Sequence, residues 1–219
     1  MEHILPPVVV VAESRTDPDD ATLFPEEAAC VANSVEKRRR EFTTVRHCAR
    51  QALSRLGLAP APIVPGTRGA PIWPAGVVGS MTHCAGYRAA VVAHAADVAA
   101  LGVDAEPHAP LPDGVLDAIA LPAELARTAG LAAARPLTCW DRILFSAKES
   151  VYKAWFPLTG RWLDFAEADI VVDPAGSFTA RLLVPGPSIR GVAVTTFSGR
   201  FVVDGGLVLT VVAILTPGN

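Results

Sequence analysis

The sequence has few lysines and no closely spaced pair of cysteines. Three of its 19 lysine and arginine residues are lysines, namely Lys37, Lys148 and Lys153. The cysteines are scattered, without a C-x-x-C pair or a Cys/His ligand spacing, at positions 30, 48, 84 and 139. None of the cysteine spacings typical of a disulfide-rich domain or a zinc site occurs. The pattern therefore favours reduced thiols in a cytoplasmic protein.

Long hydrophobic runs and a strong charge of either sign are also absent. The apolar run at residues 8–12 is far too short to span a membrane, and no basic stretch precedes it as in a signal peptide. The net charge of −3 and the pI near 5.9 argue against nucleic acid or an anionic membrane as a partner. With 51% hydrophobic and 19% charged residues, the composition is that of a globular protein.

The pattern of apolar residues predicts two halves with helices and short antiparallel strands. In the first half we expect a strand at 8–12, a helix at 26–56 that breaks near 37–41 and ends at Gly57, a loop at 59–79, and strands at 88–95 and 99–106. In the second half we expect helices at 116–133 and 137–156, then strands at 169–172, 178–184, 191–197, 200–204 and 207–215. We therefore predict an α+β fold with halves 1–106 and 107–219 and a site in the cleft between them, although no residue-level repeat is evident.

Two carboxylates end the expected strand at 99–106. Side chains alternate along a strand, so Asp104 and Glu106 point to the same side, and Pro107 ends the strand. Two converging carboxylates repel each other unless a cation lies between them, and Mg²⁺ prefers such oxygen ligands. Taken alone, however, two ordinary acidic residues at a solvent-exposed strand end explain the pattern better, because D-x-E is a common tripeptide.

A second acidic group lies on the expected helix at 137–156. Glu149 and Lys153 are one turn apart, opposite a broad apolar stripe, which on a surface helix would be a weak exposed ion pair. Phe145 and Phe156 bracket the pair, which a simple solvent face does not explain. We therefore expect the helix to bury both sides, with the charged pair in a cleft, where Glu149 completes a metal site with the two strand carboxylates.

Two further segments carry groups that can bind phosphate. A short turn at 79–84 contains Thr82 and His83, whose hydroxyl and ring N–H are suitable donors to phosphate oxygens. A basic run at 37–40 continues on the helix to Arg46 and Arg50, and guanidinium groups bind phosphate bidentately. A structural histidine and a solvated basic face remain the alternatives for these two segments.

Together these segments resemble the signature blocks of the 4′-phosphopantetheinyl transferases, and the closer similarity is to the Sfp type. The matching blocks are S-M-T-H-C at 80–84, G-V-D-A-E at 102–106 and F-S-A-K-E-S-x-x-K-A at 145–154. The stretches R-R-R-E-F-x-x-x-R-x-x-A-R at 38–50 and W-P-x-G-x-x-G-S at 73–80 agree as well. The order and spacing of the blocks make the resemblance far more specific than any one motif.

The resemblance implies a metal site and two catalytic groups. Asp104, Glu106 and Glu149 correspond to the family's ligands for Mg²⁺, with Mn²⁺ as a possible substitute. Glu149 is also the implied general base for the acceptor serine. Lys153 corresponds to the lysine that assists departure of adenosine 3′,5′-bisphosphate.

The resemblance also implies how coenzyme A is held. Thr82 and His83 match the pair that contacts its phosphates, Lys148 and Lys153 are expected beside the pyrophosphate, and Arg38 and Arg46 match positions that grip the 3′-phosphate. The implied protein is a cytoplasmic monomer of two similar α+β halves related by pseudo-twofold symmetry. Its partners would be apo acyl or peptidyl carrier proteins and domains, such as those of polyketide, fatty-acid and nonribosomal peptide synthesis.

Two other functions stay open at the level of the sequence. Another Mg²⁺-dependent phosphotransferase acting on a nucleotide would share the carboxylates but need no protein acceptor. A coenzyme A or carrier-protein binding module without transfer activity would be expected to lose Glu149 or Lys153, and this chain has both.

Overall fold

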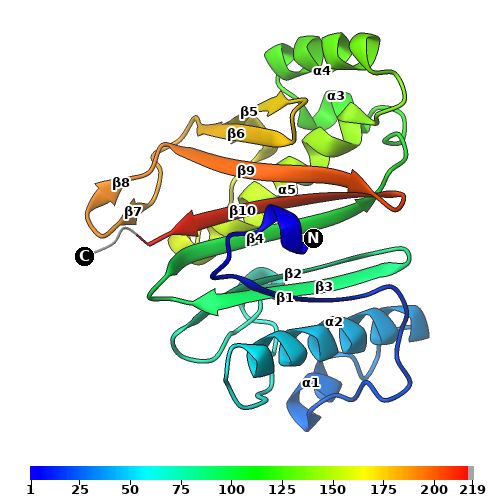
Figure 1. The fold of residues 1–219 in the computed structure, drawn as a ribbon, viewed down its shortest axis with the longest axis vertical. Coiled ribbons are helices and arrows are strands. Elements are labelled where there is room, and N and C mark those ends of the chain that lie inside the picture. Colours follow the sequence, from blue (N-terminus) through cyan, green and yellow to red (C-terminus); the bar gives the residue numbers. More distant parts are fainter. Residues whose placement is uncertain (217–219) are drawn as a thin grey trace.

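The computed structural model describes residues 1–216 and has an N-terminal half in the lower part of Figure 1. The elements of this half are the 3₁₀ turn η1 (Glu2–Ile4), strand β1 (Val10–Ser14), helices α1 (Pro25–Cys30) and α2 (Glu36–Arg55), the 3₁₀ turn η2 (Thr67–Gly69), and strands β2 (Val77–Cys84) and β3 (Tyr87–His94). The strands form a 3-stranded antiparallel sheet in the order β1-β3-β2. Helices α1 and α2 lie below this sheet in the view.

The C-terminal half contains a larger sheet and its own helices. Its elements are strand β4 (Val98–Pro107), helices α3 (Val115–Ile119), α4 (Pro122–Ala134) and α5 (Trp140–Thr159), the 3₁₀ turn η3 (Phe165–Glu167), and strands β5 (Ala168–Asp173), β6 (Ser177–Leu182), β7 (Ser188–Ile189), β8 (Val192–Ala193), β9 (Thr196–Asp204) and β10 (Leu207–Leu215). Five of these strands form a sheet in the order β4-β10-β9-β6-β5. Helix α5 lies behind this sheet in Figure 1. The α+β class predicted from the sequence is confirmed.

Strand β4 connects the two halves. It precedes the connector at 107–112, but it pairs antiparallel with β10, so that Thr210 lies opposite Asp104. The carboxylates that end β4 are therefore held by the C-terminal sheet. The division of the chain after residue 106 remains our proposal. By its position in the sequence β4 falls in the first half, whereas by its hydrogen bonds it belongs to the sheet of the C-terminal half.

The two sheets meet where β2 runs beside β4, and side-chain hydroxyls join them. Ser80 Oγ accepts a hydrogen bond from the Val103 backbone N–H at 3.1 Å, and Thr82 Oγ1 accepts one from the Ala105 N–H at 3.0 Å. All four residues are buried, so these amides need a partner. The two hydroxyls therefore accept hydrogen bonds from β4 amides across the boundary between the sheets, as backbone carbonyls do within each sheet.

Each half has one long helix packed on its sheet. Helix α2 buries Cys48, Ala49, Ala52 and Leu53 against β1 and β3, and small residues there let helix and sheet approach closely. Helix α5 packs on β4 even more closely at Gly102, where a Cβ would overlap the Ser150 carbonyl oxygen and lie 2.7 Å from the Ala154 nitrogen. The backbones of β4 and α5 are therefore in direct contact.

Most predicted elements are present, with four corrections. The helix predicted at 116–133 is divided into α3 and α4, and the strands predicted at 191–197 and 200–204 are instead the short β8 and one continuous β9. The helical region in the first half does break, but at residues 31–35 rather than at 37–41, and α2 ends before Gly57, which has the expected positive φ of 83°. The segment 79–84, predicted as a turn, is instead part of strand β2. None of the helices within residues 1–216 has the length and apolar character that crossing a membrane requires.

One local correspondence between the halves, which the sequence did not make evident, is the start of a short helix in each. Helix α1 and helix α4 each begin with a proline, and each carries a glutamate at its third position. Glu27 accepts from the Phe24 N–H at 3.0 Å, and Glu124 accepts from the Leu121 N–H at 2.7 Å. Both glutamates are buried, at 0% and 1% exposure.

The two buried glutamates hold matching parts of each half. In the N-terminal half the carboxylate binds the Ile63 N–H at 2.8 Å and Arg50 of the long helix α2 at 2.9 Å. In the C-terminal half it binds the Ile170 N–H at 2.7 Å and Lys148 of the long helix α5 at 2.9 Å. The halves therefore share an anchor between a short helix, a long helix and the chain that follows it. This correspondence is what a pseudo-twofold relation predicts.

Candidate active site

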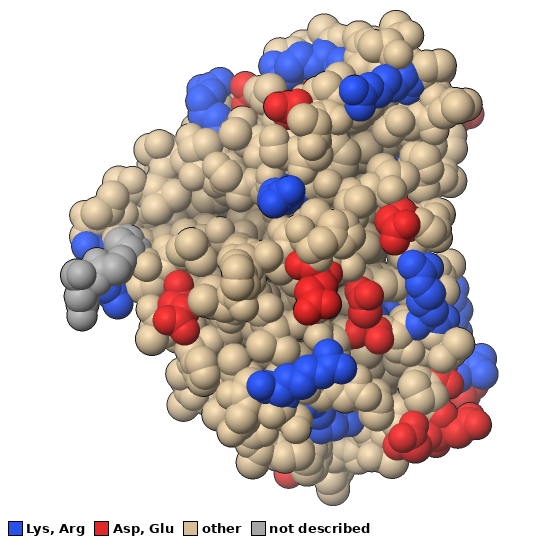
Figure 2. Space-filling view, in the orientation of Figure 1, with Lys and Arg blue, Asp and Glu red and all other residues tan. Residues whose placement is uncertain are grey.

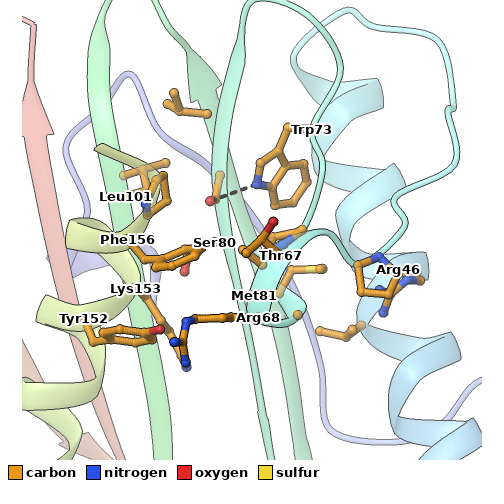
Figure 3. Close-up of a pocket in the computed structure, with 18 of the residues that line it drawn as sticks. Arg46, Thr67, Arg68, Trp73, Ser80, Met81, Leu101, Tyr152, Lys153 and Phe156 are labelled. Atoms are coloured by element: carbon orange, nitrogen blue, oxygen red, sulfur yellow. Dashed lines mark hydrogen bonds between the residues drawn. The ribbon is translucent and has the colours of Figure 1, made fainter. Parts of the chain in front are cut away.

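A cleft of about 830 Å³ lies between the two halves. Its wall includes residues of α2 and β2 and of the loop around η2 from the N-terminal half, and residues of β4 and α5 from the C-terminal half. Figure 3 shows the aromatic rings of Tyr152 and Phe156 on one side and Arg46 on the other. This size and position are typical of a ligand site.

The cleft wall carries more positive than negative charge. Among its described residues the cations are Arg38, Arg46, Arg68 and Lys153, whereas Glu149 is the carboxylate. Such an excess of cations in a partly enclosed cleft favours an anionic ligand.

Asp104 is the most strongly held acidic group beside the cleft. It is 5% exposed, and its Oδ1 accepts from Lys153 Nζ at 2.7 Å while its Oδ2 accepts from Ser146 Oγ at 2.8 Å. The hydroxyls of Ser146 and Thr210 are in turn 2.9 Å apart. Ser146 and Lys153 are two turns apart on α5, so one face of this helix supplies both donors.

The other two predicted ligands lie close enough to affect each other's charge. Burial is the main reason that the pKa of Glu149 is raised above its ordinary value, while Lys153 lowers it and Asp104 and Glu106 raise it further. Burial and Asp104 also raise the pKa of Glu106, although Arg142 donates to that carboxylate at 2.9 Å and opposes the shift. The three carboxylates thus form one acidic group with unfavourable mutual repulsion.

This acidic group fits a divalent metal by the chemistry of its donors. Within residues 1–216, no three His, Cys, Asp or Glu side chains already converge as a metal cage. Mg²⁺ does not require one, because it takes one or two protein carboxylates and completes its shell with water and substrate phosphates. Burial is the main cause of the raised pKa of Glu106 and Glu149, and a cation there would relieve the mutual repulsion that adds to it.

His83 and Arg38 lie together at the cleft wall. Arg38 Nη1 is 2.9 Å from His83 Nε2, and Glu41 is 3.7 Å from His83 Nδ1. Burial lowers the pKa of His83, Glu41 opposes this, and Arg38 lowers it further. Because a guanidinium only donates, His83 Nε2 accepts from Arg38 and the ring N–H on Nδ1 faces Glu41, so His83 orients Arg38, whose remaining N–H groups can bind a phosphate.

Arg46 forms part of the cleft wall but is already engaged by the protein. It is 4% exposed, its Nε donates to the Ile63 carbonyl at 2.8 Å, and its guanidinium lies 3.1 Å from the centre of the Phe42 ring. Burial lowers its pKa to about 10, although Glu27 opposes the shift. Arg46 therefore contributes charge to the wall from a fixed position.

Trp73 and Gly79 explain the W-P-x-G-x-x-G-S stretch. Trp73 Nε1 donates to the Gly79 carbonyl at 3.0 Å, the bond drawn in Figure 3. A Cβ at position 79 would lie 2.7 Å from the indole ring, so glycine is needed for the ring to pack there. This contact ties the loop around η2 to β2 and shapes the cleft wall.

The structure does not place Thr82 on the cleft wall, contrary to what the resemblance implies. Because residues 79–84 belong to a strand, neighbouring side chains alternate in direction, and His83 faces the cleft while Thr82 faces β4. The Thr82 hydroxyl accepts from Ala105 N–H and lies 3.4 Å from Asp104 Oδ1. Both contacts are with β4, the strand that carries Asp104 and Glu106.

Lys148 is likewise not part of the cleft wall. Its side chain is 2% exposed, and its amine contacts Glu124 at 2.9 Å and the carbonyls of Phe165 and Ala168 at 2.7 and 3.0 Å. Consecutive residues on a helix point about 100° apart, so Lys148 faces the interior of the C-terminal half when Glu149 faces the cleft. These contacts do not support the expectation that Lys148 lies beside the pyrophosphate, which stays a prediction.

A Lys148→Met variant tests this prediction. Removing the lysine leaves Glu124 as a buried carboxylate without its cation, so we expect a loss of about 3–5 kcal/mol in the free energy of unfolding. Under conditions where the variant is folded, its KM for coenzyme A should stay within about twofold of the wild-type value, because each tenfold change would need about 1.4 kcal/mol of lost binding. Urea unfolding and initial rates measure the two effects. A large rise in KM with unchanged stability would contradict the placement of Lys148.

The sequence interpretation missed three polar residues around the acidic group. Arg142 and Ser146 lie seven residues before Glu149 and Lys153, respectively, which is two helical turns on the same face. That spacing could have identified them. Arg68 gave no such signal, since it lies in a loop rich in proline and glycine.

One buried and two half-buried carboxylates beside a cation-lined cleft define a site for a phosphorylated ligand, of the kind found in metal-dependent group transfer. Comparison with known proteins identifies the particular family. The model of the 4′-phosphopantetheinyl transferase N-terminal domain matches residues 26–93, and that of the 4′-phosphopantetheinyl transferase superfamily matches residues 100–207. These matches cover both halves and both sides of the cleft.

Three curated proteins are similar along most of the chain. The 4′-phosphopantetheinyl transferase Svp of Streptomyces mobaraensis is 61% identical over 99% of this chain and 89% of its own length. PptT of Mycobacterium tuberculosis is 53% identical over 93% of this chain and 91% of its own. Npt of Nocardia iowensis is 49% identical over 97% of this chain and 99% of its own. The chain belongs to the 4′-phosphopantetheinyl transferase family, whose members are enzymes that transfer phosphopantetheine from coenzyme A to carrier proteins.

Proposed function

We propose that this chain transfers 4′-phosphopantetheine from coenzyme A to a serine of apo acyl or peptidyl carrier proteins and releases adenosine 3′,5′-bisphosphate. The observation that carries the proposal is the position of the buried Asp104 beside Lys153, at a cleft whose wall has an excess of cations. Coenzyme A has phosphates at both ends of its nucleotide and matches such a wall in charge.

Asp104, Glu106 and Glu149 would hold Mg²⁺, or Mn²⁺ in its place. When bound, the ion would offset the charge of the diphosphate as the bond to the β-phosphorus is exchanged. The protein's part is to keep three carboxylates together despite their repulsion. Arg142 and Lys153 do this here by placing a cation beside Glu106 and Asp104, respectively.

Glu149 is our candidate for the general base. Burial raises the pKa of Glu149 and the two neighbouring carboxylates add to this shift, while Lys153 opposes it. It also lines the cleft, so the serine can approach it. Deprotonated Glu149 takes the serine proton as the oxygen attacks phosphorus.

Lys153 is our candidate for stabilising the leaving group. Its side chain is 27% exposed and lines the cleft, so the amine can reach a ligand while donating to Asp104. A positive charge there favours the extra negative charge on the departing phosphate. His83, Arg38 and Arg46 would hold the remaining phosphates from the N-terminal half.

The setting in which the enzyme acts is a further part of the proposal. Its four cysteines are free thiols, as expected for a cytoplasmic protein. Both α+β halves needed for the cleft come from one chain, so we propose a monomer. On the face in Figure 2, acidic and basic residues are interspersed, so this face has no continuous basic surface for nucleic acid or an anionic membrane.

The first experiment is the intact mass of an apo acyl carrier protein after incubation with this protein, coenzyme A and Mg²⁺. We expect a mass increase of one phosphopantetheine group, which EDTA prevents and replacement of the carrier's acceptor serine by alanine abolishes. Transfer that persists in EDTA would contradict the metal assignment. Failure to modify any apo carrier, despite binding of coenzyme A, would show a binding module rather than a transferase.

A further inference from the structure

One polar residue interrupts the apolar strand β10. Thr210 is the only residue in the run 207–215 whose side chain is not a hydrocarbon, and it is 0% exposed. Its neighbours on the same face of the strand, Val208 and Val212, belong to the hydrophobic cluster that includes the buried residues of α5. A hydroxyl buried in such surroundings destabilises the fold unless it has a hydrogen-bond partner, and Ser146 of α5 is that partner.

Thr210, Ser146 and Asp104 come together from three neighbouring elements of the C-terminal half (Figure 1). Strand pairing places Thr210 of β10 opposite Asp104 of β4, and α5 lies behind both strands. Ser146 Oγ, which is also in a residue of 0% exposure, lies 2.8 Å from Asp104 Oδ2 and 2.9 Å from Thr210 Oγ1. Thr210 Oγ1 additionally donates to the Ser146 carbonyl at 2.9 Å. The three side chains thus form a hydrogen-bonded chain inside the protein.

The number of protons sets the direction of this chain. The Asp104 carboxylate is paired with the Lys153 ammonium group and can only accept, so the Ser146 proton is directed to it. The contact between the two hydroxyl oxygens then has only the Thr210 proton, which is shared between the hydroxyl and the carbonyl oxygen of Ser146. Thr210 therefore donates to Ser146, and Ser146 donates to Asp104. Hydrogen bonds in such a chain polarise and strengthen one another.

Ser146 orients Asp104 without neutralising it. The χ2 torsion of an aspartate is broad, so the plane of its carboxylate has to be fixed by contacts. Lys153 binds Oδ1 at 2.7 Å, but its positive charge also offsets the negative charge that attracts a metal ion. The neutral Ser146 hydroxyl fixes Oδ2 and leaves the charge of the carboxylate unchanged. Carboxylates that bind metal ions are held by outer hydrogen bonds of this kind.

We propose that Ser146 and Thr210 are positioning residues, which hold Asp104 in the orientation that a divalent metal ion requires. This inference rests on the proposed function, because it concerns the ion that the transfer reaction needs. Both side chains are 0% exposed, so they act through Asp104 and not through contact with coenzyme A or the carrier protein. Substituting them should therefore change metal binding first.

Binding of Mn²⁺, measured with and without coenzyme A from the electron paramagnetic resonance signal of the free ion, tests this role apart from turnover. Ser146→Ala should weaken Mn²⁺ binding by about 10- to 100-fold, the range for loss of an outer hydrogen bond to a metal ligand. Thr210→Val keeps the shape of threonine but removes the donor behind Ser146, so we expect a smaller loss. Thr210→Ser keeps that donor and should bind Mn²⁺ as the wild type does.

Ser150→Ala is the matched control for Ser146→Ala. Ser150 is one turn further along α5 and equally buried, but its hydroxyl donates to the Ala147 carbonyl at 2.9 Å. Circular dichroism and urea unfolding establish that each variant is folded under the conditions of the titration. We expect Ser150→Ala to bind Mn²⁺ with wild-type affinity.

The outcomes separate positioning from packing. Weaker binding in Ser146→Ala and Thr210→Val, with wild-type affinity in Thr210→Ser and Ser150→Ala, supports the proposal. Wild-type affinity in folded Ser146→Ala overturns it, and so does an equal loss in Ser150→Ala, which would show a general effect of altering α5. Wild-type protein that binds no Mn²⁺ under either condition would contradict the metal assignment of the proposed function, and this inference with it. Wild-type protein that binds Mn²⁺ but modifies no carrier would contradict only the transfer activity.

Discussion

Replacing Asp104 by alanine is expected to abolish transfer, with a fall in kcat/KM of roughly 1000-fold or more, because the buried carboxylate serves both the proposed metal and Lys153. Its loss removes a ligand and leaves the lysine amine without its acidic partner. The measurement is the initial rate of carrier modification by intact mass at saturating Mg²⁺.

The structure indicates how to separate this chemical effect from unfolding. Asp104→Asn keeps the shape of the side chain and an oxygen that can accept from Ser146, while it removes the charge. We expect its activity to fall nearly as far as that of Asp104→Ala, with a circular dichroism spectrum like that of the wild type. Asp20→Ala, at an exposed loop position, is the control and should be fully active. Near-normal transfer by folded Asp104→Asn would refute the metal assignment.

Replacing Gly102 by alanine is expected to have the largest effect on stability. The new methyl group would overlap the Ser150 carbonyl oxygen, and both clashing groups are backbone, so no side chain can rotate away. Forced separation of α5 from β4 should lower the free energy of unfolding by about 3 kcal/mol. Because α5 carries Glu149 and Lys153, any shift also moves them from Asp104, and a displacement near 1 Å can reduce turnover about 100-fold.

Gly130→Ala, on helix α4, is expected to change the stability in the opposite direction. Gly130 is within α4, and a Cβ there would meet no atom within 4 Å. Alanine should therefore stabilise the protein by up to about 1 kcal/mol through its better helix propensity, with no change in activity. Urea unfolding of both variants compares them directly. Equal stability of Gly102→Ala and the wild type would mean that the close approach of helix and strand is not rigid.

The fold was predictable from the sequence where apolar periodicity was strong. Helix α5 has a broad stripe of apolar residues, and the chain around Gly205 and Gly206 has the pattern of a hairpin, so both were predicted near their observed positions. Strand β2 was missed because polar residues occupy its exposed and buried faces alike. The hydroxyls of Ser80 and Thr82 are buried as acceptors for β4, a partner that local sequence cannot reveal.

The candidate site was predictable to the extent that its residues share one strand or one helix face. Asp104 with Glu106, and Glu149 with Lys153, follow from alternation and from the helical turn. The orientation of α5 does not follow, because a helix buried on both sides gives no sign of which charged residue faces the cleft. The expected place of Lys148 came from the resemblance alone, and its buried contact with Glu124 was not predictable from the sequence. The two proline-led glutamates were overlooked because four-residue similarities are common by chance, and only their buried partners reveal the correspondence.

The internal repeat has a consequence for how the two ends of the site can change. If a site lies between identical subunits, one gene encodes both walls of the site. A substitution that improves one wall then also changes the same residue in the subunit that forms the other wall. In this chain the repeated halves are encoded separately, and their equivalent anchors already differ, with Arg50 on Glu27 and Lys148 on Glu124. One copy can therefore specialise in holding the nucleotide while the other keeps the reactive carboxylates, without either being constrained by its counterpart.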